Sequence, residues 1–196
     1  LILKFFINLL FIIILNSLFY KKFINMSNKN IAIIYGSDTG TTENIAISIH
    51  KKIGEKKVDL LEVNRVSPDD FKKYKIILLG VPTWHFGQLQ SDWDYFLPDF
   101  KKIDFRGIKT TYFGLGDQLG YPDSFVDGIG ILAKIVLENG GEVFGSWPTD
   151  GYDFDESLGV NSDGDFYGLV IDDDNQHEMT DERIDKWLSQ IKDQCV

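Results

Sequence analysis

The chain has 196 residues, 43% of them hydrophobic, which is enough for one domain with a buried core. Its net charge of −10 argues against nucleic acid as a partner, because binding to nucleic acid requires positive charge. The single cysteine, Cys195, excludes an internal disulfide, and the three distant histidines have no zinc-ligand spacing.

Residues 1–25 differ in composition from the rest of the chain. They consist almost entirely of Phe, Ile, Leu, Lys, Asn and Tyr, and the apolar run Phe5–Phe19 is short for a membrane span. No small-x-small cleavage site follows the run. We expect residues 1–25 to be a hydrophobic leader, either mistranslated upstream sequence before a start at Met26 or a targeting or anchoring segment. Residues 26–196 then form the folded domain.

The domain opens with a predicted buried strand, Ile31–Tyr35, and a helix predicted over Glu43–Ile53. Between them lies a turn rich in hydroxyl groups and glycine, with the sequence Gly36-Ser37-Asp38-Thr39-Gly40-Thr41-Thr42. The free N–H groups of a helix N-terminus, together with such hydroxyls, suit a phosphate. The turn contains no Lys or Arg, which favours a retained cofactor over a nucleotide that is turned over.

Three other interpretations of this turn were considered. The first is an ordinary helix cap, since Ser and Thr are common capping residues. A Walker-A loop would need Lys where Thr41 stands, and the span from Gly36 to Gly40 is too short. The dinucleotide fingerprint Gly-x-Gly-x-x-Gly is also missing, so an NTPase or an NAD enzyme is not expected.

The later elements alternate between strands and helices. The predicted strands are Val58–Val63, Ile76–Gly80, Thr110–Leu115, and Glu142–Ser146 together with Phe166–Ile171. The predicted helices are Pro68–Tyr74, Asp92–Phe100, Ser124–Asn139 and Asp181–Gln194. This alternation predicts a three-layer α/β fold with a doubly wound, five-stranded parallel sheet in the order 2-1-3-4-5. The long segment Trp147–Asp165 is predicted to be an insertion that splits the fifth strand.

Ligands of such a sheet bind at the carboxyl ends of its strands, near the point where the strand order reverses. This rule selects the hydroxyl turn, the loop Pro82–Gly87 after the third strand and the loop Gly116–Tyr121 after the fourth. Trp84 and Tyr121 lie in the last two loops. An isolated aromatic residue is more often a packing residue, but two on one edge can enclose a flat ring. A phosphate at one end and a flat ring at the other describe flavin mononucleotide, FMN.

Met26–Val196 resembles a long-chain flavodoxin. The motifs that carry the resemblance are Gly36–Ala46, Pro82-Thr83-Trp84, Gly87–Trp93, Gly116-Asp117-Gln118 and Trp147–Tyr152, and the split fifth strand is typical of the long-chain group. The resemblance implies noncovalently bound FMN and low-potential, one-electron transfer without turnover of a substrate.

The resemblance also implies roles for individual residues. The phosphate would be held by Ser37, Asp38, Thr39, Gly40, Thr41 and Thr42, and the ribityl chain would contact Thr83 and Asp150. Trp84 would cover the inner face of the flavin ring and Tyr121 the outer face. The peptide His85–Phe86 would flip on reduction. The other expected contacts come from Pro82, Gly87, Leu115, Gly116, Asp117 and Gln118.

The partners implied are a ferredoxin/flavodoxin-NADP reductase and low-potential acceptor enzymes, which would bind an acidic face. We expect a monomer in the cytoplasm, or in an organelle stroma if residues 1–25 are a targeting segment. No nucleic acid or membrane partner is expected for the folded domain. Protonation of His85 beside the flavin would couple pH to the potential, although a plain solvated histidine is the simpler interpretation.

Two other functions share this fold. A flavodoxin-like NAD(P)H:quinone oxidoreductase is the alternative, but it needs open space over the flavin, which Tyr121 would block. A response-regulator receiver needs carboxylates after the first and third strands, where this chain has hydroxyls and Pro-Thr-Trp.

Overall fold

The computed structural model describes residues 29–195. The predicted leader, residues 1–25, lies outside this range. Seven strands form one sheet: β1 (Ile31–Tyr35), β2 (Val58–Glu62), β3 (Ile76–Trp84), β4 (Gln88–Leu89), β5 (Lys109–Leu115), β6 (Glu142–Val143) and β7 (Leu169–Ile171). The helices of the described residues are α2 (Thr41–Ile53), α3 (Pro68–Phe71), α4 (Ser91–Phe100), α5 (Asp127–Glu138) and α6 (Thr180–Ile191), with three short 3₁₀ helices between them and a fourth after α6. None of the helices described is long and apolar enough to cross a bilayer.

The central strands are parallel and run in the order β2-β1-β3-β5-β6. Strand β7 also pairs with β5, at Phe113–Leu115, whereas β6 pairs with β5 at Lys109 and Thr110. The two short strands are therefore the two halves of one fifth strand, separated by residues 144–168. This arrangement confirms the predicted order and the predicted split.

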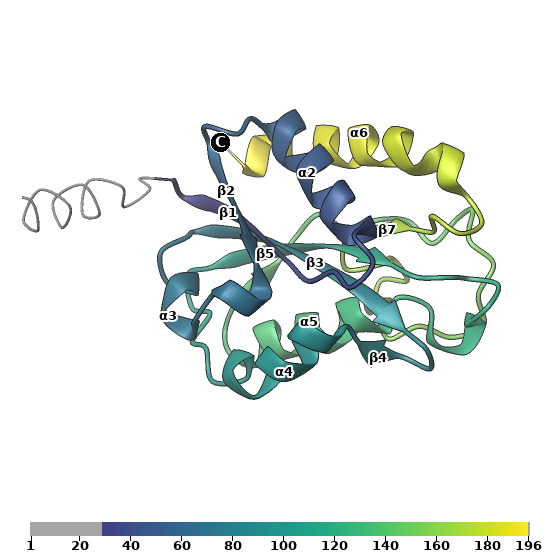
Figure 1. Cartoon of the computed structure of the whole chain (residues 1–196), viewed down its shortest axis with the longest axis horizontal. Coiled ribbons are helices and arrows are strands. Elements are labelled where there is room, and N and C mark those ends of the chain that lie inside the picture. Colours follow the sequence, from purple (N-terminus) through teal and green to yellow (C-terminus); the bar gives the residue numbers. More distant parts are fainter. Residues whose placement is uncertain (1–28, 196) are drawn as a thin grey trace, which may run out of the picture.

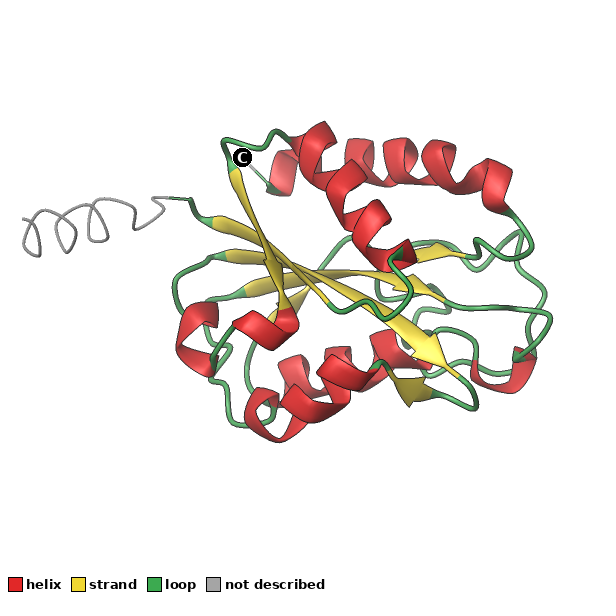
Figure 2. Ribbon diagram, in the orientation of Figure 1, coloured by secondary structure: helices red, strands yellow, loops and turns green. Residues whose placement is uncertain are grey.

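Helices cover both faces of the sheet. In Figure 1, α2 and α6 lie on one face, and α3, α4 and α5 lie on the other. Figure 2 shows the strands twisting between these two helical layers. The central strands β1, β3 and β5 are buried along most of their length, with Ile31–Tyr35 buried throughout, as expected for a parallel sheet covered on both sides.

Some element boundaries differ from the predicted ones, for local reasons. Strand β3 continues to Trp84, because its last two residues pair with β4 in an antiparallel hairpin. Helix α5 begins at Asp127 instead of Ser124, because Val126 has a φ of 51° that a helix cannot contain. The helix predicted over Pro68–Tyr74 ends at Phe71.

The carboxyl ends of the parallel strands meet at one edge of the sheet, which places the three predicted loops together. The opposite edge holds the C-terminal ends of α2 and α6. There a small apolar hollow is lined by Ile53, Leu188, Ile191 and Cys195 and is bordered by lysines.

Candidate functional site

The turn between β1 and α2 presents unpaired N–H groups and hydroxyls to one side. Gly40 has a φ of 90° as the N-cap of α2, and its N–H donates to Ser37 Oγ over 3.0 Å. The first intrahelical bond runs from Asn44 N to Gly40 O, so the N–H groups of residues 41–43 have no acceptor within the helix. The turn is thus built to bind an anion.

Asp38 connects this turn to the start of α4. Its Oδ1 accepts from Gln90 Nε2 over 2.9 Å and from Ser91 Oγ over 2.7 Å. Burial raises the pKa of the Asp38 carboxyl, but these hydrogen bonds outweigh that effect and bring the pKa below its ordinary value. Asp38 is therefore a fixed negative charge at neutral pH.

The end of β3 supplies the inner wall. Thr83 Oγ1 accepts from the N–H of Gly128 over 2.9 Å, which fixes the strand end against α5. Trp84 follows, and its buried indole Nε1 has no hydrogen-bond partner within residues 29–195. An unpaired buried donor is costly, so the position of this indole depends on its packing in the wall of the site.

The next turn is strained. His85 has a φ of 48° and Gly87 a φ of 84°, both in the left-handed region. The carbonyl oxygen of His85 accepts from Ser124 Oγ over 3.4 Å. Phe86 is 87% exposed, and its ring meets the ring of Tyr121 edge-on, with 5.8 Å between the ring centroids. Tyr121, which is predicted to cover the outer face of the flavin ring, therefore has the solvent-facing ring of Phe86 beside it.

The loop after β5 folds around Asp117. One carboxylate oxygen of Asp117 accepts from the N–H groups of Leu119 and Gly120, at 3.1 and 2.8 Å. The N–H of Gly120 is the main cause that holds the pKa of Asp117 below its ordinary value, against the opposing effect of burial. Tyr121 closes the turn through a bond of 3.0 Å from its N–H to the carbonyl oxygen of Asp117.

These loops enclose a cavity of about 380 Å³, within the size range usual for small-molecule sites. Most of the residues predicted from the sequence line it. They are Ser37, Asp38, Thr39, Thr41, Thr42, Pro82, Thr83, Trp84, His85, Leu115, Gly116, Asp117 and Tyr121.

Five predicted residues lie outside this lining. Gly40 and Gly87 shape the two turns, and Phe86 points into solvent beside Tyr121. Gln118 is buried, and its side chain bonds to Asp172 and to the backbone of Asp153. Asp150 lies in an exposed turn of the inserted segment and is not among the residues that line the cavity.

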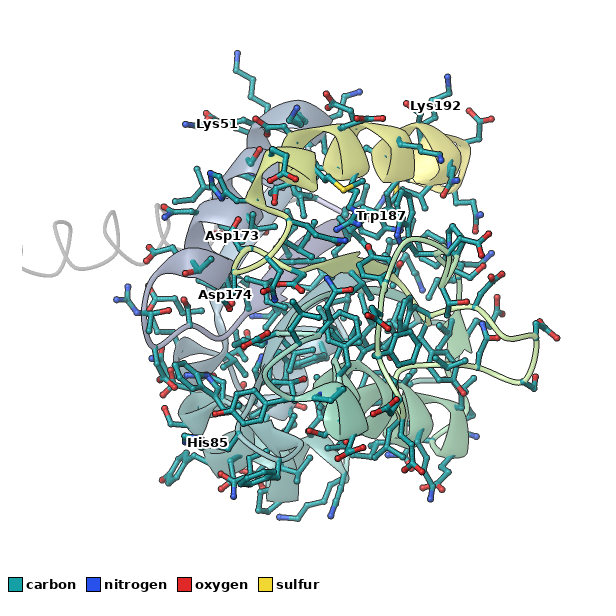
Figure 3. All side chains as sticks on the ribbon, turned by 90° about the vertical axis from the view of Figure 1, so that its right-hand side faces the viewer. Lys51, His85, Asp173, Asp174, Trp187 and Lys192 are labelled. Carbon is teal, nitrogen blue, oxygen red and sulfur yellow. The ribbon has the colours of Figure 1, made fainter. Side chains whose placement is uncertain are left out.

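Two lining residues were not predicted, Asp173 and Asp174. They lie two and three residues after the end of β7, the second half of the split strand, so the rule that selected the other loops also applies to them. Figure 3 looks onto this edge and shows the two aspartates on one side of it and His85 on the other.

Asp174 has an unfavourable electrostatic environment. Burial raises the pKa of its carboxyl, and the charges of Asp117, Asp172 and Asp173 raise it further. Among residues 29–195, the cavity lining contains four aspartates and no Lys or Arg. An anionic part of a ligand therefore belongs at the hydroxyl turn, where backbone N–H groups and the helix dipole provide the positive potential.

The hydrogen-bond donors and the aromatic side chains of the cavity fit a ligand with a phosphate at one end and a planar ring at the other. The hydroxyl turn offers N–H groups and hydroxyls that suit a phosphate, and Trp84 and Tyr121 come from separate loops on one cavity. Fold and site together define an open α/β protein that binds a phosphorylated aromatic compound at the carboxyl edge of its sheet.

The chain belongs to the flavodoxin family, because the family model described as "Flavodoxin" matches residues 33–187. A flavodoxin of Synechocystis sp. is 47% identical over 163 residues, which cover 83% of this chain and 95% of that protein. Flavodoxin 1 of Escherichia coli is 44% identical over 162 residues, 83% of this chain and 92% of that protein.

Solved structures agree with the fold. The structure of Fusobacterium nucleatum flavodoxin bound to flavin mononucleotide superposes with a TM-score of 0.78 at 33% identity. The match covers 84% of this chain and 97% of that one. Oxidised flavodoxin 1 of Bacillus cereus, at 22% identity and a TM-score of 0.61, supports the fold alone.

Proposed function

We propose that this chain binds one FMN noncovalently and carries single electrons at low potential between a reductase and acceptor enzymes. The observation that carries the proposal is the meeting of the hydroxyl turn with Trp84 and Tyr121 in one cavity. The FMN-bound relative from F. nucleatum supports the choice of ligand.

Within this proposal the phosphate lies at Ser37–Thr42, and Trp84 and Tyr121 flank the ring. When bound, FMN supplies the redox chemistry by accepting electrons one at a time. The protein orients the ring and limits access of water to its faces. Because the lining carries four aspartates and no cation, it disfavours additional negative charge on the ring and so keeps the potential low.

We also propose that Asp174 and not Asp150 contacts the ribityl chain. Asp174 is one of the residues that line the cavity, whereas Asp150 is not. The remaining expected contacts, including the His85–Phe86 peptide, remain predictions for the bound state.

The protein is further proposed to be a monomer without substrate turnover of its own, acting in the cytoplasm or in an organelle stroma if residues 1–25 are a targeting segment. The folded domain is residues 26–196. Tyr121 and the exposed Phe86 occupy the outer side of the site and leave little room for a nicotinamide or a quinone. Acceptors and reductases are expected to approach this rim with a basic surface.

The test is the visible spectrum of purified residues 26–196 after addition of FMN. We expect one FMN per chain, quenching of flavin fluorescence, and reduction in two separate one-electron steps. A colourless protein that does not take up FMN would overturn the proposal. Steady oxidation of NAD(P)H by the pure protein with a quinone would favour the oxidoreductase alternative.

A further inference from the structure

Asp172 is a carboxylate with no solvent exposure, directly behind the acidic wall of the cavity. It follows β7 and precedes Asp173 and Asp174. Its Oδ1 accepts from the backbone N–H of Asn175 over 3.0 Å, and its Oδ2 accepts from Gln118 Nε2 over 2.5 Å. Asp172 Oδ2 also accepts from the backbone N–H of Gln118 over 3.2 Å and from Asn175 Nδ2 over 2.9 Å.

Every partner of this side chain is a donor. Two backbone N–H groups and two side-chain amides converge on the two oxygens of Asp172. A carboxylate accepts at both oxygens, whereas an Asn at this position would direct its own NH₂ group at one of these donors. The site therefore suits a side chain that accepts at both oxygens, and an isosteric amide would leave buried donors unpaired.

These bonds join two segments that are distant in sequence and that both line the cavity. Gln118 belongs to the loop that carries Asp117 and Tyr121, and Asn175 belongs to the turn after β7. Asn175 Nδ2 also donates to Asp117 Oδ1 over 2.8 Å, which closes the network directly at the cavity lining.

The inserted segment is attached to the same network. The N–H of Asp153 donates to Gln118 Oε1 over 2.6 Å. Gln118 thus uses its amide nitrogen for Asp172 and its amide oxygen for the insertion. The loop after β5 and the turn after β7 meet at the buried carboxylate of Asp172, and the insertion joins them through Gln118.

We infer that Asp172 is a positioning residue that sets the spacing between the outer aromatic wall and the acidic wall of the cofactor cavity. The inference rests on the proposed function, in which FMN occupies that cavity. The side chain of Asp172 does not line the cavity and acts through Gln118 and Asn175.

The negative charge of Asp172 also acts on a residue of the cavity lining, because it is one of the charges that raise the pKa of Asp174. A buried negative charge so close to the ring site disfavours the anionic reduced flavin. Removal of the charge should therefore shift the potential of the second one-electron step to less negative values.

The experiment compares the parent with Asp172→Asn in the apo and FMN-loaded forms. In the apo-protein we expect hydrogen exchange at the amides of Gln118, Leu119, Gly120 and Asn175 to become at least about tenfold faster. We expect the Kd for FMN to rise roughly 10- to 100-fold, because two charge-assisted bonds are lost. The visible circular dichroism of bound FMN should change as its two walls shift.

Two control variants separate positioning from loss of stability. Asp163→Asn removes the same charge from the exposed part of the insertion and should leave all readouts unchanged. Phe105→Leu weakens the core at the opposite edge of the sheet, so it should lower stability but not affinity for FMN. If Asp172→Asn does not fold, Asn175→Ala removes the exposed end of the network and should weaken FMN binding less.

The outcomes are distinct for the two proposals. If the parent does not bind FMN, the proposed function fails, while the exchange data on the apo-protein still decide whether Asp172 fixes the two loops. Unchanged exchange in Asp172→Asn would overturn the inference. Faster exchange with an unchanged Kd and an unchanged second potential would overturn it as well.

Discussion

The hydroxyl of Thr42 is buried at the base of the phosphate turn, where Thr42 is 2% exposed. Its neighbours Ser37, Thr39 and Thr41 share the same side of the cavity. In the absence of a cationic side chain, each of these hydroxyls carries a larger share of the binding of a phosphate than it would beside a lysine.

Replacement of Thr42 by Val keeps the shape of the side chain and removes one hydroxyl. We expect the Kd for FMN to rise roughly three- to tenfold, the effect of one neutral hydrogen bond. Titration by flavin fluorescence measures the change. Riboflavin, which lacks the phosphate, serves as the control ligand and should bind both proteins equally. An equal loss for both ligands would place Thr42 outside the phosphate site.

Asp174 gives a pH-dependent prediction. Its folded-state pKa is raised, first by burial and then by three neighbouring carboxylates, so the ionised form destabilises the folded apo-protein above that pKa. Asp174→Asn should therefore be more stable than the parent at pH 7. As the pH falls through the raised pKa, the parent becomes protonated and the difference shrinks.

Urea unfolding of the apo-proteins between pH 4 and pH 8 measures this difference. Asp163→Asn is the matched control, because its carboxylate is exposed in the insertion and away from the cluster. A difference in unfolding free energy that does not vary with pH would show that the neighbouring charges do not act on Asp174.

At the scale of the elements, two turns at the cavity depend on glycine residues in the left-handed region. Gly40 and Gly87 have φ values of 90° and 84°, but a Cβ at Gly40 would meet nothing within 4 Å. A Cβ at Gly87 would lie 2.6 Å from Asp127 Oδ2. The same substitution at the two positions therefore separates backbone strain from steric overlap.

We expect Gly87→Ala to destabilise the apo-protein by about 1–3 kcal/mol more than Gly40→Ala, because only Gly87 meets a second segment. Denaturant midpoints of the two variants and the parent measure the effect. Equal losses would mean that the 85–87 turn moves away from Asp127 without cost.

The order of strands and helices could be predicted from the sequence, since buried apolar runs and cap residues carry that signal locally. The boundaries of the strands and helices were harder to predict from the sequence. The extension of β3 to Trp84 depends on pairing with β4, and the late start of α5 depends on strain at Val126, which neighbouring segments impose. Neither cause is visible in the residues of the element itself.

The site was predictable where a single loop carries its own chemistry, as in the hydroxyl turn and at Trp84 and Tyr121. The site was less predictable near the fifth strand, whose two halves are separated by the insertion. Asp173 and Asp174 follow a strand of three residues, and Gln118 is turned inward by a partner 54 residues away. Such contacts require knowledge of the insertion's path.

At the scale of the whole molecule, the carboxyl edge carries the aspartates of the cavity, while lysines border the hollow at the opposite edge. A basic reductase should therefore be oriented toward the cavity at long range. We expect the rate of electron transfer from a reductase to fall as the ionic strength rises, because the Debye length shortens to about 8 Å at physiological salt.

Stopped-flow reduction by a ferredoxin/flavodoxin-NADP reductase between 10 and 300 mM NaCl measures this dependence. Phe86→Ala is an informative companion, because it removes the most prominent apolar group at the rim without a change in charge. Its salt dependence should parallel that of the parent. A rate that does not depend on salt would argue against electrostatic orientation.

The lone thiol, Cys195, belongs to the apolar hollow at the edge opposite the cavity. Because burial raises the pKa of this thiol, it should react slowly with maleimides until the end of the chain opens. Once the Cys195 thiol is coupled to a surface-bound maleimide or to a gold electrode, every molecule is attached through the same residue. The edge that carries the cavity would then face the bulk solution, where soluble redox partners can reach it.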